Sequence, residues 1–206
     1  MKEYKLPIGC DVPETIILAD GDFPSHPLAL EWLRQCLYVV CCDGAANTYI
    51  RSGRMPEAIV GDGDSLLPDI KERYASLIHS EAEQETNDLS KAFRFCLSQE
   101  RKRITIMGAT GKREDHTIGN VSLLADCMEQ AEVSMMTDYG IFVPIREDSM
   151  FESYIGQQIS VFNMNSTALS AEGLAYPLSV FTNWWQGTLN EALARHFIIR
   201  TEGKVL

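Results

Sequence analysis

The chain has 206 residues, of which 45% are apolar and 23% charged, and its formal net charge at pH 7 is -11. This composition is that of an ordinary globular protein, and the length allows one large domain or two small ones. The negative charge argues against a nucleic acid or an anionic membrane as partner, because such partners require a basic surface.

The cysteines and the amino terminus indicate an intracellular protein. No stretch approaches the roughly 20 apolar residues of a membrane span, and the first residues lack the apolar core of a signal peptide. The six cysteines show no CxxC pairing, and several lie in apolar runs. We therefore expect reduced, structural cysteines and a cytoplasmic location.

Short apolar runs alternate with helical patterns through the first two-thirds of the chain. The runs predict buried strands at residues 14–20, 37–43, 57–62, 103–109 and 131–138. The segments between them predict helices at residues 27–36, 44–53, 68–76, 87–100 and 115–130. Strands buried on both faces and alternating with helices are typical of a parallel α/β sheet.

The pattern changes after about residue 139. Short apolar segments broken by Gly, Asn and Ser follow, and they predict antiparallel β-structure, with one possible helix at residues 188–197. We therefore expect two domains, an α/β domain over residues 1–140 and a smaller β domain over residues 141–206.

Carboxylates stand where the expected strands end. Asp43 follows the second run, Asp62 and Asp64 follow the third within GDGDS, and Asp88 opens the helix that Asn87 caps. Two carboxylates held about 4 Å apart repel by roughly 4 kcal/mol near a protein surface, and a divalent cation would offset that repulsion. Singly, each acid is better explained as a turn or a helix cap. Because parallel strands end at one edge of a sheet, the set together predicts a Mg²⁺ site.

A glycine-containing stretch, GATGKREDH at residues 108–116, lies between an expected strand and an expected helix. Backbone N–H groups and a helix dipole can hold an anion at such a place, although the spacing is not that of a Walker A loop. The alternative is a helix-capping loop with two solvated basic residues. We expect this loop, with Gly108 and Thr110, to bind the phosphates of a nucleotide, with Lys112 and Arg113 supplying the positive charge that a triphosphate needs.

The ordered motifs resemble those of the thiamine pyrophosphokinase family. DGAAN after a strand, GDGDS, QETND before a helix and GATGKREDH occur in the family order. Further on, GLAYPLS (173–179) and LNEA (189–192) are similar to the family segments GLKYPL and SNE. Each motif is unspecific alone, but the series runs from Asp43 to the C-terminal region and is specific as a series.

This resemblance implies an enzyme that moves a pyrophosphoryl group from ATP to thiamine, releases AMP and depends on Mg²⁺. It also implies an open, mainly parallel sheet with flanking helices, a C-terminal antiparallel β-sandwich for thiamine binding and dimerisation, and a homodimer with sites at the subunit interface. By position, the catalytic residues are Asp43, Asp62, Asp64, Asp88 and Arg113. The implied metal ligands are Asp62, Asp64 and Asp88. The other polar positions near nucleotide and thiamine are Gln84, Asn87, Arg113 and Asp115.

Some positions depart from the family pattern. Asn87 replaces a threonine, Lys112 replaces a glycine, and Leu189 replaces the serine of SNE, which leaves Thr188 as the nearest hydroxyl. Trp184 and Trp185 precede that segment, and one of them could stack on the thiamine pyrimidine, a contact worth ~1–3 kcal/mol. The alternative for each tryptophan is a core or interface aromatic.

The mechanism that follows is in-line attack of the thiamine hydroxyl oxygen on the β-phosphorus of ATP. Arg113 would meet the developing charge, and Asp88 or Asp43 could accept the hydroxyl proton. Two alternatives stay open. One is a metal-dependent nucleotide phosphohydrolase that uses the same acids on water, and the other is a non-catalytic module that binds a nucleotide or thiamine diphosphate.

Overall fold

The computed structural model describes residues 1–7, 11–81, 83 and 85–206. It divides into two compact units. One consists of Gly9–Phe142 and is called the α/β unit here; the other consists of Met1–Ile8 with Val143–Leu206 and is called the β unit. Over the described residues, no helix has both the length and the apolar character needed to cross a membrane.

The α/β unit alternates strands and helices along its chain. Its strands are β2 (Thr15–Leu18), β3 (Val39–Cys42), β4 (Ala58–Val60), β5 (Ile78–His79), β6 (Arg103–Met107), β7 (Glu132–Met136) and β8 (Ile141–Phe142). Its helices are α1 (Pro27–Gln35), α2 (Ala45–Arg51), α3 (Pro68–Arg73), the 3₁₀ turn η1 (Ala75–Leu77), α4 (Asp88–Ser98) and α5 (Glu114–Cys127).

The strands of this unit form one seven-stranded sheet in the order β5-β4-β3-β2-β6-β7-β8. Every neighbouring pair is parallel except β7 with β8. The chain builds outward from β2 to β5 and then returns to place β6 on the other side of β2. The order therefore reverses between β2 and β6, and such a switch point is where open α/β sheets bind ligands.

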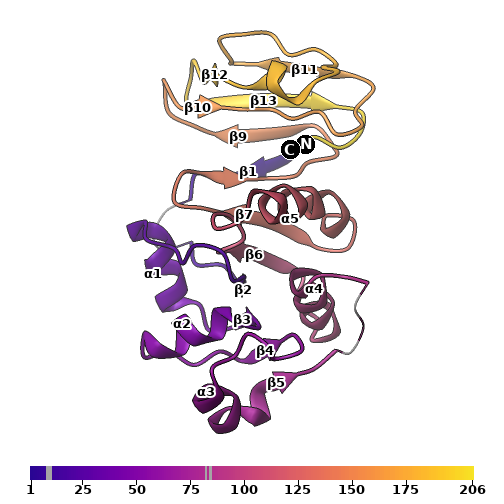
Figure 1. Cartoon of the computed structure of the whole chain (residues 1–206). Coiled ribbons are helices and arrows are strands. Elements are labelled where there is room, and N and C mark those ends of the chain that lie inside the picture. The colour runs from indigo at the N-terminus through magenta and orange to yellow at the C-terminus, as the bar shows by residue number, and fades with distance from the viewer. Residues whose placement is uncertain (8–10, 82, 84) are drawn as a thin grey trace. The chain divides into compact units, whose positions relative to one another are not determined.

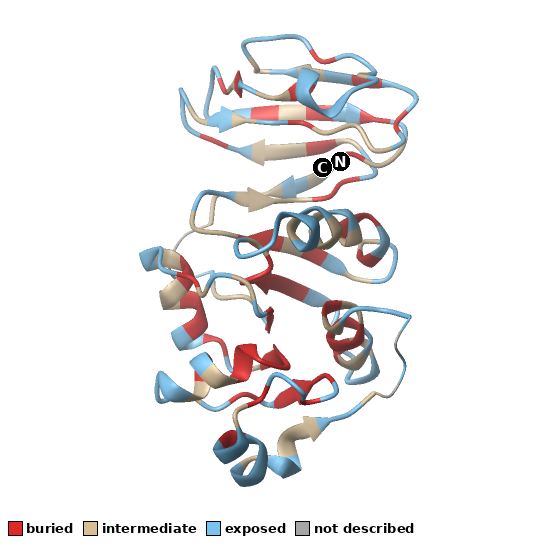
Figure 2. Ribbon diagram, in the orientation of Figure 1, coloured by how far each residue is buried: buried red, intermediate tan, exposed pale blue. Residues whose placement is uncertain are grey.

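Helices cover both faces of this sheet, with α1, α2 and α3 on one face and α4 and α5 on the other (Figure 1). Alternate strand residues point to opposite faces. Ile16 and Leu18 of β2 accordingly join the cluster of Trp32 and Leu33 from α1, while α4 packs against β3 and β4. All four residues of β2 and of β3 are buried, and Figure 2 shows the buried residues along the centre of the sheet.

The β unit contains two sheets and a core of its own. Its elements are β1 (Lys2–Tyr4), β9 (Ser149–Glu152), β10 (Gln158–Ile159), β11 (Leu169–Glu172), the 3₁₀ turn η2 (Trp184–Gly187), β12 (Asn190–Glu191) and β13 (His196–Thr201). A four-stranded sheet runs β1-β9-β13-β11, and β10 pairs with β12. Apolar side chains such as Val161, Leu178 and Phe197 form the core.

The expected alternation of strands and helices is confirmed for the α/β unit, and two expectations for the rest are corrected. The possible helix at residues 188–197 is wrong, because Asn190–Glu191 forms β12 and pairs with β10 instead. The amino-terminal residues also differ from the expected division at residue 140: β1 pairs in parallel with β9, so these residues belong to the β unit.

The described cysteines are structural, as expected. Cys36, Cys41, Cys42, Cys96 and Cys127 are free and buried, and Cys10 lies outside the described residues. Burial raises the pKa of each of these five thiols, which makes them poor nucleophiles.

Candidate active site

Three carboxylates meet where β3 and β4 end. Asp43 directly follows β3, and Asp62 and Asp64 follow β4 in the GDGDS turn. One carboxylate oxygen from each of these three residues lies within 4.8 Å of the others. The neighbouring parallel strands β3 and β4 end at the same edge, which brings the acids of separate sequence units together.

Asp43 is the buried member of this acid cluster. Its backbone has φ 34°, in the left-handed region that side chains other than glycine rarely adopt. Its Oδ2 accepts a hydrogen bond from the Ser65 backbone at 3.1 Å, while its buried Oδ1 has no hydrogen-bond partner among the described residues. A buried carboxylate oxygen left in this way needs a ligand or a proton.

The exposed acids are held by their own turn. The Asp64 backbone N–H donates to Asp62 Oδ1 at 3.1 Å, and the Ser65 hydroxyl donates to Asp64 Oδ1 at 3.0 Å. Lys71 of α3 donates to the Gly63 carbonyl at 2.6 Å. Hydrogen bonds within the turn and from Lys71 therefore fix its conformation, and its two carboxylates lie next to Asp43.

Burial and hydrogen bonding shift the pKa values in the acid cluster. Burial, with a smaller contribution from the neighbouring carboxylates Asp64 and Asp88, raises the pKa of Asp43 to about 6. The pKa of Asp64 is lowered, first by the hydrogen bond from Ser65 and then by its interaction with Asp43. In the absence of a cation, the pair thus carries its shared proton on Asp43.

The start of α4 adds a fourth acid and a buried lysine. Asn87 caps this helix as expected: its Oδ1 accepts from the Ser90 backbone at 2.9 Å. Asp88, the first helical residue, lies outside the acid cluster, yet its charge acts on Asp43. The ammonium of Lys91, one turn later, is 3.3 Å from Asp88 Oδ1, and the Lys91 side chain is only 7% exposed.

The loop after β6 lies at the switch point. The Gly21 backbone donates to the Gly108 carbonyl at 2.7 Å, and the Asp22 backbone donates to the Thr110 carbonyl at 2.9 Å. Lys112 has φ 55°, a conformation that costs a non-glycine residue roughly 1–2 kcal/mol. The resemblance had implied a glycine at this position, and the backbone conformation gives the physical reason.

Arg113 and Asp115 pair with each other rather than with the acid cluster. Their side chains form a two-point ion pair at 2.6 and 3.1 Å, with both residues largely exposed. Hydrogen bonds from the Arg113 side chain lower the pKa of Asp115 to about 2. Gln84, which was also expected near the nucleotide, lies outside the described residues.

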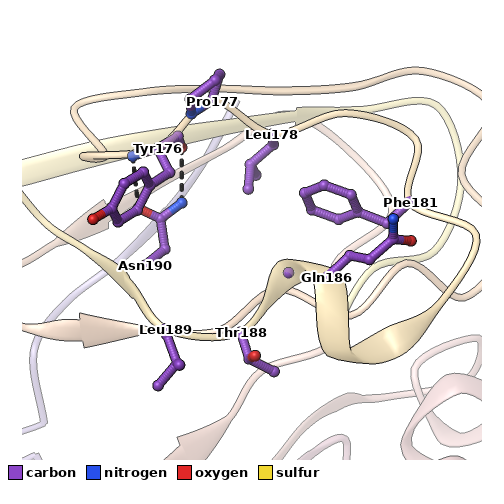
Figure 3. A pocket seen from close by; sticks show the side chains of 9 residues that line it. Tyr176, Pro177, Leu178, Phe181, Gln186, Thr188, Leu189 and Asn190 are labelled. Atoms are coloured by element: carbon purple, nitrogen blue, oxygen red, sulfur yellow. Dashed lines mark hydrogen bonds between the residues drawn. The ribbon is translucent and has the colours of Figure 1, made fainter.

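The residues expected to contact thiamine lie in the β unit. A cavity of about 300 Å³ is lined there by apolar, hydroxyl and amide side chains, including Leu178, Thr188 and Gln186 (Figure 3). Asn190 forms part of its wall and is fixed by two hydrogen bonds with the Tyr176 backbone, at 3.0 and 2.8 Å.

The two tryptophans are exposed and lie outside the lining of this cavity. Trp185 is 72% exposed, and Trp184 is 46% exposed and makes an edge contact with Phe162, with ring centroids 6.0 Å apart. Over the described residues, the cavity lining includes Thr188 but neither tryptophan. Leu189, which also lines the cavity, has φ 62°.

Two residues near the acids were not predicted as site residues. Asp20 lies two residues after the end of β2, as Asp62 does after β4, and its carboxylate lies beside Gly44. The rule applied to the other acids would therefore have found it. Lys91 carried a weaker signal, its position three residues after Asp88 on one helix face. Lysines at such positions are normally exposed, and only the packing of α4 shows that this one is buried.

Comparison with known proteins gives two family matches. Residues 29–137 match the thiamin pyrophosphokinase catalytic domain, and residues 140–206 match the thiamin pyrophosphokinase substrate-binding domain. The first match alone spans more than half of the chain.

Curated relatives are similar over shorter stretches. The chain is 30% identical to thiamine pyrophosphokinase 1 of rice, Oryza sativa subsp. japonica, over 129 residues, which are 50% of this chain and 49% of that protein. It is 34% identical to thiamine pyrophosphokinase of Bacillus subtilis over 86 residues, 40% of each chain. The chain spans about half the length, or less, of the curated relatives it matches.

Solved structures share the fold. Thiamin pyrophosphokinase from Candida albicans superposes with a TM-score of 0.81 at 18% identity, covering 99% of this chain and 91% of that one. Thiamine pyrophosphokinase from Bacillus subtilis gives a TM-score of 0.74 at 20% identity, covering 93% and 95%. With both domain families matched in order along the sequence, the chain belongs to the thiamin pyrophosphokinase family.

Proposed function

We propose that the chain transfers the pyrophosphoryl group of ATP to thiamine, giving thiamine diphosphate and AMP. The observation that carries this proposal is the acid cluster of Asp43, Asp62 and Asp64 at the carboxyl edge of a parallel sheet. Membership of the family supports the choice of substrates.

The acid cluster fits a divalent cation, which we propose to be Mg²⁺. All donors are carboxylate oxygens, the ligands that this ion prefers, and the buried Oδ1 of Asp43 has no other partner among the described residues. Bound there, the ion would neutralise phosphate charge and polarise a phosphoryl oxygen. We place Asp88 in the same site as a further acid, because its charge acts on Asp43.

The chain's own residues then position the polyphosphate and move one proton. Lys112 and Arg113 supply positive charge next to the β6–α5 loop, and Gly108 and Thr110 shape that loop. Either Asp88 or Asp43 accepts the proton of the thiamine hydroxyl. Phosphoryl transfer needs alignment and charge neutralisation more than covalent help from the protein. The pairing of Arg113 with Asp115 requires Arg113 to turn toward the substrate when ATP binds.

We propose that the β unit binds thiamine. The family match describes residues 140–206 as a substrate-binding domain, and the cavity beside Thr188 and Asn190 offers both apolar walls and amide groups. Trp184 or Trp185 is our candidate for stacking on the pyrimidine ring, because both present exposed aromatic area next to that cavity wall.

We also propose that the chain forms a homodimer. Large apolar side chains are exposed on the β unit, among them Tyr154, Ile155, Trp185, Leu189 and Leu193. Exposed apolar residues in such number suit burial against a second copy. Sedimentation equilibrium at micromolar concentration should give twice the mass of the 23.1 kDa chain.

The experiment that tests the proposed reaction measures AMP and thiamine diphosphate from ATP with Mg²⁺, in the presence and absence of thiamine. Both products should appear only when thiamine is present. Asp62→Asn and Asp64→Asn should each reduce turnover by at least about 100-fold, because each removes a carboxylate that would hold the cation that neutralises the phosphates. Asp126→Asn, which changes an exposed acid near the end of α5, should leave turnover unchanged.

Other outcomes select the alternatives. ATP hydrolysis that does not depend on thiamine would favour the nucleotide phosphohydrolase. Nucleotide or thiamine diphosphate binding without any turnover would favour the non-catalytic binding module, and Asn87 and Leu189 would then be the first positions to exchange for the family residues.

A further inference from the structure

Two loops close on each other at the switch point. They are the β2–α1 loop, which contains Asp20, and the β6–α5 loop, which contains Lys112. The loops are joined by backbone hydrogen bonds and are closely packed at Gly21. A Cβ added to Gly21 would lie 2.3 Å from the Thr110 carbonyl oxygen. The loops therefore form one fixed surface between the ends of β2 and β6.

A side-chain contact ties the same loops together. The Lys112 ammonium donates to the Asp20 backbone carbonyl at 2.9 Å and to Asp20 Oδ1 at 3.1 Å. Both side chains remain about half exposed. An ammonium has three donors, so Lys112 can contact Asp20 and a further anion at the same time.

Asp20 also lies next to the acid cluster. A Cβ added to Gly44 would be 2.6 Å from Asp20 Oδ2, and Gly44 directly follows Asp43. One oxygen of Asp20 therefore contacts Lys112 while the other lies against the backbone that carries Asp43. Asp20 thus holds the Lys112 ammonium beside the carboxylates of the acid cluster.

We propose that Asp20 is a positioning residue that holds the Lys112 ammonium beside the acid cluster, where Lys112 contacts the polyphosphate of a bound nucleotide. The inference rests on the proposed function for its ligand. An exposed ion pair contributes little to folding stability, and a free lysine side chain samples many conformations. Fixing that side chain before the nucleotide arrives therefore improves binding more than it stabilises the fold.

The test is a thermodynamic cycle on nucleotide binding. Lys112→Gly removes the ammonium and also relieves the left-handed backbone of Lys112, so it should fold at least as well as the unmodified chain. Asp20→Asn keeps the size of the side chain but weakens its hold on the ammonium. The dissociation constant for ATP with Mg²⁺, and separately for adenosine, is measured by calorimetry for both variants and for the double variant.

Lys112→Gly should weaken ATP binding about 10-fold and Asp20→Asn about 3- to 5-fold, with adenosine binding unchanged in both. The double variant should bind ATP no more weakly than Lys112→Gly alone, because Asp20 acts through Lys112. The matched control is Glu31→Gln, which removes an exposed acid paired with Arg34 in α1 and should leave ATP binding unchanged.

Three outcomes would overturn the proposal. Tighter ATP binding by Asp20→Asn would mean that Asp20 only repels phosphate. If the decreases in ATP affinity of the two single variants multiply in the double variant, the two residues act independently. If the unmodified chain does not bind ATP, Lys112 has no polyphosphate to contact. Normal ATP binding and a normal cycle, without thiamine diphosphate formation, would leave the role of Asp20 standing and reject the proposed reaction alone.

Discussion

At the scale of single residues, Asp43 combines features that are costly in a folded chain. It is 4% exposed, its backbone is left-handed, and one of its carboxylate oxygens has no partner among the described residues. Strain of this kind persists where a binding partner makes use of it. A cation bound at the proposed site would give the buried Oδ1 of Asp43 a partner and would thereby offset part of this free-energy cost.

A pH titration of stability tests this reading. Burial raises the pKa of Asp43 from 3.8 to about 6, so the folded state binds the proton more tightly than the unfolded state. The resulting stabilisation is complete below about pH 4 and is lost as the pH rises through 6. Asp43→Asn removes this titration. The measured quantity is the free energy of unfolding of Asp43→Asn minus that of the unmodified chain, in EDTA. This difference should increase between pH 4 and 7 by on the order of 2 kcal/mol.

The same variant should lose thiamine diphosphate synthesis, although its stability relative to the unmodified chain is greater at pH 7 than at pH 4. Asp126→Asn serves as the control, because it removes an exposed acid outside the acid cluster. A stability difference between Asp43→Asn and the unmodified chain that stays constant between pH 4 and 7 would mean that Asp43 titrates normally in the folded protein.

At the scale of elements, helix α4 connects local sequence to the site. Asn87 caps its amino terminus, Asp88 is its first residue, and the buried Lys91 lies one turn later. The Asn87 amide also donates to Asn120 of α5 at 3.4 Å, and Asn120 donates to the Ala109 carbonyl at 2.8 Å. The cap thereby joins α4, α5 and the β6–α5 loop.

Replacing the cap should loosen this connection. Asn87→Ala should lower the free energy of unfolding by about 1 kcal/mol, because the Ser90 backbone N–H loses its acceptor. Asn87→Thr keeps a capping oxygen and introduces the family residue. Its free energy of unfolding should stay within about 0.5 kcal/mol of that of the unmodified chain. Urea unfolding followed by circular dichroism measures both. Equal losses in the two variants would show that the cap bond contributes nothing.

Elements of the α/β unit could be predicted because their signals are local. The strands β2 and β3 are buried throughout and, except for Thr15, consist of apolar residues, and α4 has both a cap and an apolar face. The acid cluster followed from the same logic, because an acid after each strand implies a shared edge. The pairing partner of Leu189–Ala192 could not be predicted: its spacing fits a helix, but the left-handed Leu189 and the β10 partner decide for a strand. Tertiary pairing here overrides local preference.

At the scale of the whole molecule, each unit has a hydrophobic cluster of its own, and over the described residues these two clusters do not share residues. Trp32 belongs to the core of the α/β unit, whereas Trp184 and Trp185 lie in the β unit. The β unit includes an aromatic stack that crosses three strands, with Phe151 between Tyr4 and Phe197 at centroid distances of 4.8 and 5.0 Å. The first residues of the chain thus contribute to the stability of the unit formed by the last ones.

Tyr4→Ala should therefore destabilise the β unit alone. The loss of a partly buried, stacked ring should cost about 2 kcal/mol. In a Trp32→Phe background, fluorescence reports only Trp184 and Trp185, and its denaturation midpoint should fall. In a background with Trp184→Phe and Trp185→Phe, the Trp32 signal should keep its midpoint. Tyr139→Ala, a fully exposed position in the α/β unit, is the control. Equal shifts of both signals would mean that the units unfold together.

The parallel pairing of β1 with β9 also sets an order of events on the ribosome. Residues 2–4 leave the exit tunnel before residues 149–151, with which they pair, and at about 5–20 residues per second the partner strand follows only many seconds later. The complete α/β unit is translated in that interval and can fold, while the first strand still waits with its backbone groups unpaired. A reporter or affinity tag joined next to Lys2 is therefore expected to slow the folding of the β unit, to which β1 belongs, rather than that of the α/β unit that follows it in the sequence.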